Sequence, residues 1–216
     1  MIKVLSYTKE PLLFMGQVAS TCWNSSPSKD IAKKCLKANH NRVLEYPDVT
    51  IEIKDYSARM IRELYTHCVG VTRLQQSTRY VDYKNFNYYT PNTVNNNPDA
   101  LSVYDSIMSD ISTSYQNLYE MGIPKEDIAN ILPLGMTSTV VLKINLRAIL
   151  HMFEERTCSR AYVEFREFMK ELKCVLVGLD EDWKYIIENY AKTKCEKVGF
   201  CKEAKSCDKF KAIGKA

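Results

Sequence analysis

Four residues with side chains suited to anion binding stand close together in the segment 145–156. Asn145 precedes a run of apolar residues at helical spacing, and Arg147, His151 and Arg156 follow within that run. On a helix, positions 147 and 151 share one face, and position 156 lies about 90° from position 151. An amide, two guanidinium groups and an imidazole so placed favour an anionic, planar ligand. A solvated charged face is the alternative that the periodicity leaves open.

A second anion-binding candidate lies in the sequence RLQQSTRYVDYKNFNYY at residues 73–89. Its QSTR segment combines a serine hydroxyl, backbone N–H groups and the guanidinium of Arg79, which together suit a phosphate. The tyrosines that follow offer aromatic surfaces for stacking on a base or ring. An aromatic-rich loop at a subunit interface is the alternative interpretation.

Three of the eight cysteines, Cys195, Cys201 and Cys207, stand at two equal spacings of six residues. They are compatible with a zinc site or a cluster that uses a fourth ligand such as Cys174, with a disulfide, or with free thiols. The chain contains no CxxC pair, and the spacing differs from that of common zinc sites. We therefore assign no metal site from the sequence.

Several well-known catalytic motifs are absent from the sequence. Neither a GxGxxG nor a GxxxxGK phosphate loop occurs, and there is no GxSxG nucleophile turn or HExxH zinc motif. The chain contains only three histidines, His40, His67 and His151. Nucleophilic catalysis and zinc-dependent hydrolysis are therefore not expected.

The composition is that of a globular chain that can bury a core. It has 216 residues, 45% of them hydrophobic and 26% charged, with a net charge of +4. No apolar run approaches the ~20 residues that span a bilayer, and the N-terminus does not resemble a signal peptide. We expect a cytoplasmic protein without a membrane or nucleic-acid partner. The lysine-rich segment after Lys192 is interpreted as a solvated surface, with nucleic-acid binding as an alternative.

Hydrophobic periodicity predicts a mixture of strands and helices without regular βα alternation, which is typical of an α+β fold. Alternating and β-branched segments predict strands, and 3.6-residue periodicity with caps such as Ser28 and Gly122 predicts helices. The expected strands are 2–7, 49–57 and 136–145; the expected helices are 12–23, 28–38, 58–68 and 98–122, a short one after Pro124, and two more within 146–176; residues 90–99 are expected to form a loop.

Three segments together resemble the flavin-dependent thymidylate synthases. HNRVLEYPDVTIEI (40–53) looks like that family's HxSxxEH motif followed by a strand, and RELYTHCVGVTRLQQSTRYVDY (62–83) occupies the place of its QxxRHRxxxxxxxSxRY signature. The most specific is ILPLGMTSTVVLKINLRAILHMFEERTCSRAYVEFR (131–166), which is similar to the family's LP…NxRxLxxFxxRxxxxAQxEIR. The resemblance covers residues 40–170.

The sequence departs from the family where its signature is strongest. Thr66-His67-Cys68 replaces Arg-His-Arg, and the spacing from there to Ser77 is one residue longer. Glu63 replaces a glutamine, and Tyr46 replaces the histidine of EH. Two arginines that would help to hold the flavin are therefore missing.

The resemblance implies roles for particular residues of this chain. It implies that Arg156 is catalytic, contacting and polarising the uracil ring. Together with Arg156, the dUMP site would contain Glu63, Gln75, Gln76, Ser77 and Arg79. The FAD site would contain His40, His67, Asn145, Arg147 and His151.

The family's activity is the conversion of dUMP to dTMP, with methylene-tetrahydrofolate as carbon donor and NADPH as the reductant of FAD. The resemblance implies an α+β single domain with a mixed or antiparallel sheet packed by helices, over residues 1–190, assembled as a homotetramer. Residues 191–216 would form a Lys/Cys-rich tail. Two other functions are compatible with the departures: a non-catalytic nucleotide- or flavin-binding relative, and a flavoenzyme that modifies another pyrimidine nucleotide or adds a hydroxymethyl group.

Overall fold

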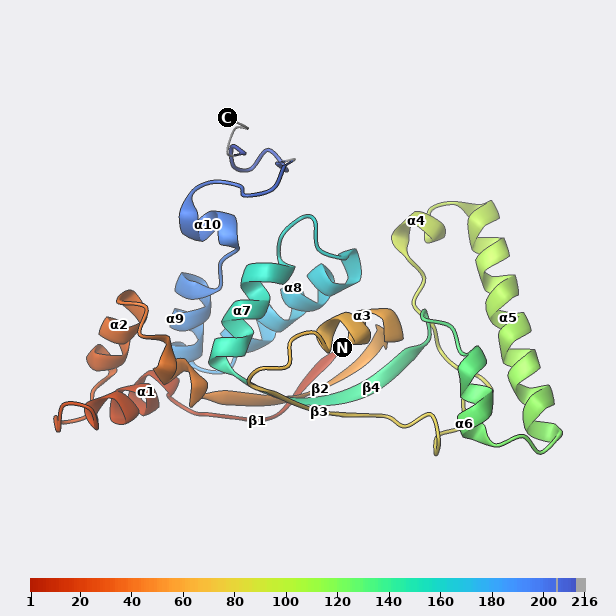
Figure 1. The fold of residues 1–216 in the computed structure, drawn as a ribbon, viewed down its shortest axis with the longest axis horizontal. Helices are drawn as coiled ribbons and strands as arrows, with labels where there is room; N and C mark the ends of the chain where they lie inside the picture. The colour runs from red at the N-terminus through yellow and green to blue at the C-terminus, as the bar shows by residue number, and fades with distance from the viewer. Residues whose placement is uncertain (205, 213–216) are drawn as a thin grey trace. The chain divides into compact units, whose positions relative to one another are not determined.

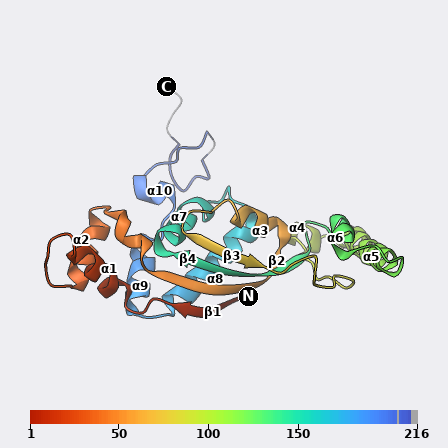
Figure 2. The same ribbon diagram turned by 60° about the horizontal axis from the view of Figure 1, so that its bottom comes forward.

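The computed structural model describes residues 1–204 and 206–212, and its strands form one four-stranded sheet (Figure 1). Figure 2 shows the strands side by side in the order β1-β2-β4-β3. They are β1 (Ile2–Tyr7), β2 (Asp48–Ser57), β3 (Val71–Gln75) and β4 (Thr137–Asn145).

The sheet is antiparallel throughout. In each strand pair, the residue numbers of the hydrogen-bonded partners rise along one strand and fall along the other, which is the pattern of antiparallel strands. The donor–acceptor pairs are Thr8–Asp48 and Lys54–Met1 for β1 and β2, Leu146–Pro47 and Ala58–Met136 for β2 and β4, and Asn145–Gly70 and Gln76–Thr139 for β3 and β4. The predicted α+β class with an antiparallel sheet is confirmed.

The chain forms two compact units, each built from separate segments. The first unit comprises Met1, Glu52–Thr66 and Arg73–Leu142, and the second comprises Ile2–Ile51, His67–Thr72 and Lys143–Ala216. Strands β2, β3 and β4 each pass from one unit into the other, so no single point in the sequence separates them. The predicted boundary at residue 190 stays a prediction, and residues 205 and 213–216 of that tail lie outside the described residues.

The first unit contains helices and a buried cluster of mainly aromatic and methionine side chains. Its helices are α3 (Ala58–Leu64), α4 (Asn92–Asn95), α5 (Pro98–Glu120), α6 (Lys125–Ile128) and the 3-10 helix η2 (Ala129–Ile131). The buried cluster contains Tyr83, Phe86, Met108, Tyr115, Ile128 and Met136. Tyr83 is therefore a core residue, whereas Tyr80 is 76% exposed.

In the second unit, α7 and α8 pack together and α1 and α2 form a helical pair. Its helices are α1 (Pro11–Ser20), α2 (Lys29–Lys37), η1 (Asn41–Glu45), α7 (Leu146–Arg156), α8 (Val163–Val177), α9 (Glu181–Tyr190) and α10 (Lys194–Val198). The largest fully buried side chains here include Phe153, Phe165, Phe168 and Trp183.

Strand β1 is held by residues from the other end of the chain. The backbone N–H of Ile2 donates to Glu171 Oε1 at 2.6 Å, and Trp183 Nε1 donates to the carbonyl of Thr8 at 2.9 Å. The Tyr7 hydroxyl donates a hydrogen bond to the carbonyl of Leu179 at 3.3 Å.

One strand was missed, and two predictions about elements were wrong. Residues 71–75 form strand β3, because the β-branched Val71 and Thr72 continue into an edge strand that pairs with β4. Helix α3 ends at Leu64 rather than at Cys68, and the expected loop 90–99 contains the short helix α4. Within residues 1–204 and 206–212, no helix is long and apolar enough to cross a membrane.

We predict that Gly70→Ala destabilises the protein more than Gly122→Ala. Both glycines have positive φ, 73° and 80°, so alanine is strained at either position by about 1 kcal/mol. A Cβ at Gly70 would also lie 2.4 Å from Asn145 Nδ2, whereas one at Gly122 meets nothing within 4 Å. Urea unfolding of both variants checks this, and equal losses would contradict it.

Candidate functional site

A cavity of about 1110 Å³ in the second unit collects most of the residues predicted to bind a cofactor. Asn145, Arg147 and His151 line it together, from the end of β4 and the first turns of α7. The backbone at Gly70 and the η1 segment form other parts of its wall. The structure thus brings three of the five predicted cofactor residues to one place.

Asn145 fixes the start of α7 at this cavity. Its Oδ1 accepts a hydrogen bond from the Ala148 backbone N–H at 2.9 Å, which caps the helix. Its own N–H donates to the Gly70 carbonyl at 2.9 Å. Because Gly70 packs directly on the Asn145 side chain, the two segments meet at a fixed distance.

The positive charges that line the cavity are partly compensated by carboxylates. Arg147 pairs with Glu45, and Lys197 donates to Glu154 at 3.0 Å. Lys192 also lines the cavity, as does the aromatic Tyr190. Lys192 and Lys197 are exposed, as the interpretation of this segment as a solvated surface predicts, and both also contribute to the cavity wall. The concentration of lysines there was the sequence signal for these residues.

His67 and Arg156 form a direct contact within the second unit. Arg156 is the last residue of α7, and its Nε donates to His67 Nε2 at 2.9 Å. The Arg156 guanidinium also lies over the Phe165 ring, 5.0 Å from its centroid. The His67 ring meets the His151 ring at 5.6 Å between centroids. The predicted catalytic arginine therefore lies among two predicted cofactor residues.

His67 is held in its neutral form. It is 9% exposed, and burial, followed by the charges of Arg156 and His151, lowers its pKa from 6.5 to about 4. A neutral imidazole has one unprotonated nitrogen, so Nε2 can accept the Arg156 bond while Nδ1 carries the proton.

His40 does not line the cavity. It is exposed in the turn between α2 and η1, and its backbone N–H donates to the Cys35 carbonyl at 2.9 Å. Its neighbours Asn39 and Asn41 do line the cavity. Its predicted role stays a prediction.

The remaining predicted nucleotide-binding residues lie in the first unit. Glu63 is in α3, Gln75 ends β3, and Gln76 and Ser77 follow it. Gln75 accepts the Tyr65 hydroxyl at 2.7 Å, and Gln76 bonds the backbone of Thr139. Both glutamine side chains thus hold the edge of the sheet.

Ser77 and Arg79 form the part of this segment best suited to a phosphate. Ser77 Oγ accepts the backbone N–H of Arg79 at 3.2 Å. Arg79 Nε pairs with Glu126 Oε2 at 2.7 Å, with 64% and 52% of the two side chains exposed. A phosphate that binds Arg79 must therefore compete with this carboxylate.

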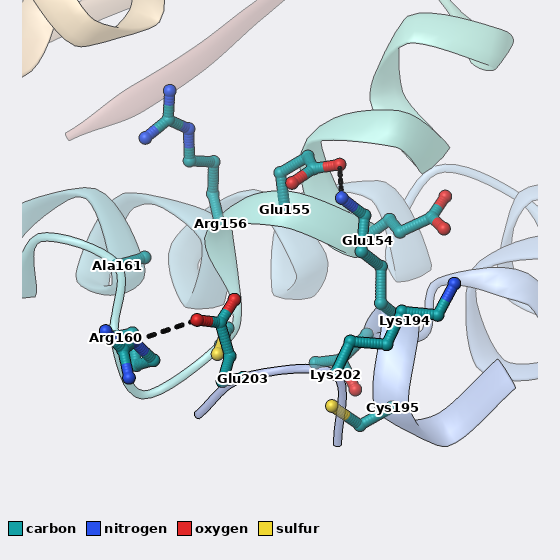
Figure 3. Close-up of a pocket in the computed structure, with 11 residues that line it drawn as sticks. Glu154, Glu155, Arg156, Arg160, Ala161, Lys194, Cys195, Lys202 and Glu203 are labelled. Atoms are coloured by element: carbon teal, nitrogen blue, oxygen red, sulfur yellow. Dashed lines mark ion pairs between the residues drawn. The ribbon is translucent and has the colours of Figure 1, made fainter. Parts of the chain in front are cut away.

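A smaller cavity of about 230 Å³ lies beyond the end of α7 in the second unit (Figure 3). Lys194 pairs with Glu155 at 2.5 Å, and Arg160 pairs with Glu203 at 3.5 Å. Arg156 lines this cavity, and its side chain extends away from Glu203 and Cys195.

We predict that the neutral His67 makes stability fall as the pH is lowered. Its folded pKa of about 4 lies below the unfolded value near 6.5, so the unfolded chain binds the proton first. The stabilisation is complete above pH 6.5 and is lost progressively as the pH falls to about 4. Urea unfolding between pH 7 and 4.5 should show His67→Gln losing less stability on acidification than the parent.

His40→Gln, at an exposed histidine, is the matched control and should follow the parent across the same pH range. Parallel curves for the parent and His67→Gln would contradict the prediction.

Comparison with known proteins supplies relatives over nearly the whole chain. A flavin-dependent thymidylate synthase of Nitratidesulfovibrio vulgaris is 26% identical over 227 residues, covering 94% of this chain and 91% of the relative. One of Pyrococcus abyssi is 26% identical over 220 residues, covering 94% and 89%. A crystal structure of thymidylate synthase X from Helicobacter pylori with FAD and dUMP is similar in fold, with a TM-score of 0.69 and 20% identity, covering 89% of this chain and 99% of that one.

The family model described as thymidylate synthase complementing protein matches residues 3–177. This range contains β1 except its first residue, all of β2 to β4, the capped start of α7 and the contact between His67 and Arg156. With most of its length matched, the chain belongs to the family of thymidylate synthase complementing proteins.

Proposed function

We propose that this protein is a flavin-dependent thymidylate synthase that converts dUMP to dTMP. FAD would be its cofactor, methylene-tetrahydrofolate its carbon donor and NADPH its reductant. The observation that carries the proposal is the joint lining of one cavity by Asn145, Arg147 and His151. Asn145 and Arg147 match the Asn and Arg of the family's most specific motif.

The cavity fits a large, anionic, partly aromatic cofactor. Its volume of about 1110 Å³ slightly exceeds the roughly 300–1,000 Å³ that is usual for ligand sites. Arg147, Lys192 and Lys197 supply positive charge for a pyrophosphate, and the N-terminal turn of α7 adds backbone N–H groups. Tyr190 offers a ring for stacking. These cations would supply the positive charge that the two arginines missing from the Arg-His-Arg motif would otherwise bring to the flavin.

FAD, when bound, supplies the redox chemistry that amino-acid side chains lack. The protein supplies position and charge. His67 accepts a hydrogen bond from Arg156 Nε and so helps to orient the guanidinium to which we assign contact with a pyrimidine carbonyl. A fixed cation at that carbonyl would favour the electron-rich form of the ring as charge develops on it.

The dUMP phosphate would be bound by Arg79 with the Ser77 hydroxyl. The guanidinium fork matches phosphate oxygens in a bidentate arrangement. Glu126 occupies that fork in the present structure, so nucleotide binding would exchange one anion for another. Glu63, Gln75 and Gln76 complete the proposed site.

The proposal extends to assembly and location. Helix α5 leaves Val103 and Ile107 exposed, at 62% and 51%, which supports its burial against another subunit of a homotetramer. A cytoplasmic location is proposed because the eight cysteines in the described structure are free thiols.

The activity is tested by incubating the purified protein with FAD, NADPH, dUMP and isotopically labelled methylene-tetrahydrofolate. Mass spectrometry should find a labelled methyl group on the nucleotide. A labelled hydroxymethyl group would indicate a related flavoenzyme, and unlabelled dUMP beside bound flavin would indicate a binding protein without catalysis.

In this assay Arg156→Ala should lower kcat about a hundredfold and weaken dUMP binding less. Arg62→Ala, at an exposed arginine of α3, is the control.

We predict opposite effects on dUMP affinity from the two partners of the Arg79–Glu126 pair. Arg79→Ala should weaken binding about tenfold or more, because the phosphate loses a charge-assisted bidentate contact. Glu126→Gln should strengthen it by about two- to fivefold, because an exposed ion pair of this kind contributes under about 1 kcal/mol. Isothermal titration with dUMP measures both changes.

Asp127→Asn removes the same charge one residue away and should change the affinity little. Unchanged affinity in Arg79→Ala would remove this residue from the site.

A further inference from the structure

A third cavity of the second unit, about 310 Å³ in volume, is lined by residues of helices α2 and α9 (Figure 1). Helix α2 contributes three lysines and an aspartate and α9 contributes two tyrosines, and we call it the lysine cavity; its lining residues are Asp30, Lys33, Lys34, Lys37, Tyr185 and Tyr190. Lys37 is three residues from Lys34 and four from Lys33, so the three side chains share one face of the helix. The buried residues of α2 lie on its opposite face, which fixes the orientation of the lysines.

The three lysines carry positive charge that the described structure does not neutralise. Within residues 1–204 and 206–212 none of them forms an ion pair, whereas Lys29 on the same helix pairs with both Glu10 and Asp182. Asp30 is the only carboxylate among the described residues of the lining. The cavity is therefore suited to an anion.

Tyr185 gives the cavity an aromatic wall beside this charge. Its ring centroid is 6.3 Å from that of Tyr190, and both side chains are half-buried. Lys33 Nζ lies 5.2 Å from the centroid of the Tyr185 ring. A cation next to an aromatic ring suits a ligand that joins a phosphate to a base, because lysine binds phosphate and tyrosine stacks on bases.

Tyr190 connects the lysine cavity to the larger cavity to which we assign FAD. Its side chain lines both cavities, and Leu36 of α2 also lines the larger one. An occupant of the lysine cavity therefore lies next to the proposed flavin site. The chain has no GxGxxG fingerprint, so a dinucleotide reductant needs a site of another kind.

We propose that the lysine cavity binds the 2′-phosphoadenosine half of NADPH, and that the nicotinamide half extends past Tyr190 into the larger cavity. This assignment rests on the proposed function, which names NADPH as the reductant. Lys33, Lys34 and Lys37 would bind the phosphates, and Tyr185 would stack on the adenine. Because the 2′-phosphate distinguishes NADPH from NADH, the site would select NADPH. The acidic γ-glutamyl tail of a folate would also attract the lysines, but it has no base for the tyrosine ring.

Isothermal titration of the FAD-saturated protein with adenosine 2′,5′-bisphosphate tests the site without any reaction. The parent should bind this probe, and the double variant Lys34→Gln with Lys37→Gln should bind it at least tenfold more weakly, because charge-assisted contacts to phosphate are lost. The double variant Lys170→Gln with Lys173→Gln is the matched control. It removes the same charge at the same spacing from exposed positions of α8 and should bind the probe as the parent does.

A parent that does not bind the probe would overturn the proposal, as would equal affinities in the parent and the Lys34/Lys37 variant. These results do not depend on methylation of dUMP. The site can therefore fail while the synthase activity is found, and it can be found in a protein that lacks the activity.

Anaerobic reduction of the bound flavin supplies a second readout. The Lys34/Lys37 variant should need at least tenfold more NADPH for half-maximal reduction, whereas its half-saturation by NADH should change much less. Equal shifts for the two reductants would contradict binding of the 2′-phosphate. A variant that binds the probe normally but loses affinity for pentaglutamyl folate, relative to the monoglutamyl form, would assign the lysines to the folate tail and overturn the proposal.

Discussion

The junction between β4 and α7 is the constraint on which the rest of the candidate site depends. A single residue, Asn145, ends the strand and caps the helix with its side chain. Its backbone N–H also donates a hydrogen bond to the Gly70 carbonyl. The end of β4 and the start of α7 are therefore positioned by the same residue. Arg147 and His151 take their positions along the cavity wall from the turns that follow, and Arg156 lies at the far end of the same rigid helix.

The pairing of His67 with Arg156 shows how a neutral histidine can accept a hydrogen bond from a cationic side chain. A protonated imidazole beside a guanidinium would repel it, but burial keeps His67 neutral and makes its Nε2 an acceptor. Of the three residues that replace the family's Arg-His-Arg, only this histidine matches the motif. Its contact orients the arginine to which we assign contact with the pyrimidine. The loss of the flanking arginines thus leaves this part of the arrangement in place.

The sequence was informative where local pattern and tertiary structure agree. Alternating apolar residues in β2 and the Ser28 cap of α2 specify their elements without long-range information, and both were predicted correctly. Strand β3 was missed because its residues alternate poorly and it exists by pairing with β4. The contribution of Lys192 and Lys197 to the larger cavity, and the joint lining of the smaller cavity by Cys158 and Cys195, depend on how distant segments fold together. Neither could be read from spacing alone.

Strand β1 depends on partners that are synthesised late. Glu171, Leu179 and Trp183, which bond Ile2, Tyr7 and Thr8, are synthesised 169 to 175 residues after these partners. Until then the first strand has apolar residues and open hydrogen-bonding groups without these partners. Folding of the second unit on the ribosome must therefore end with the closure of contacts more than 160 residues apart, a high-contact-order step that is slow by its topology. During translation, the N-terminal strand would be the segment that chaperones have most reason to protect.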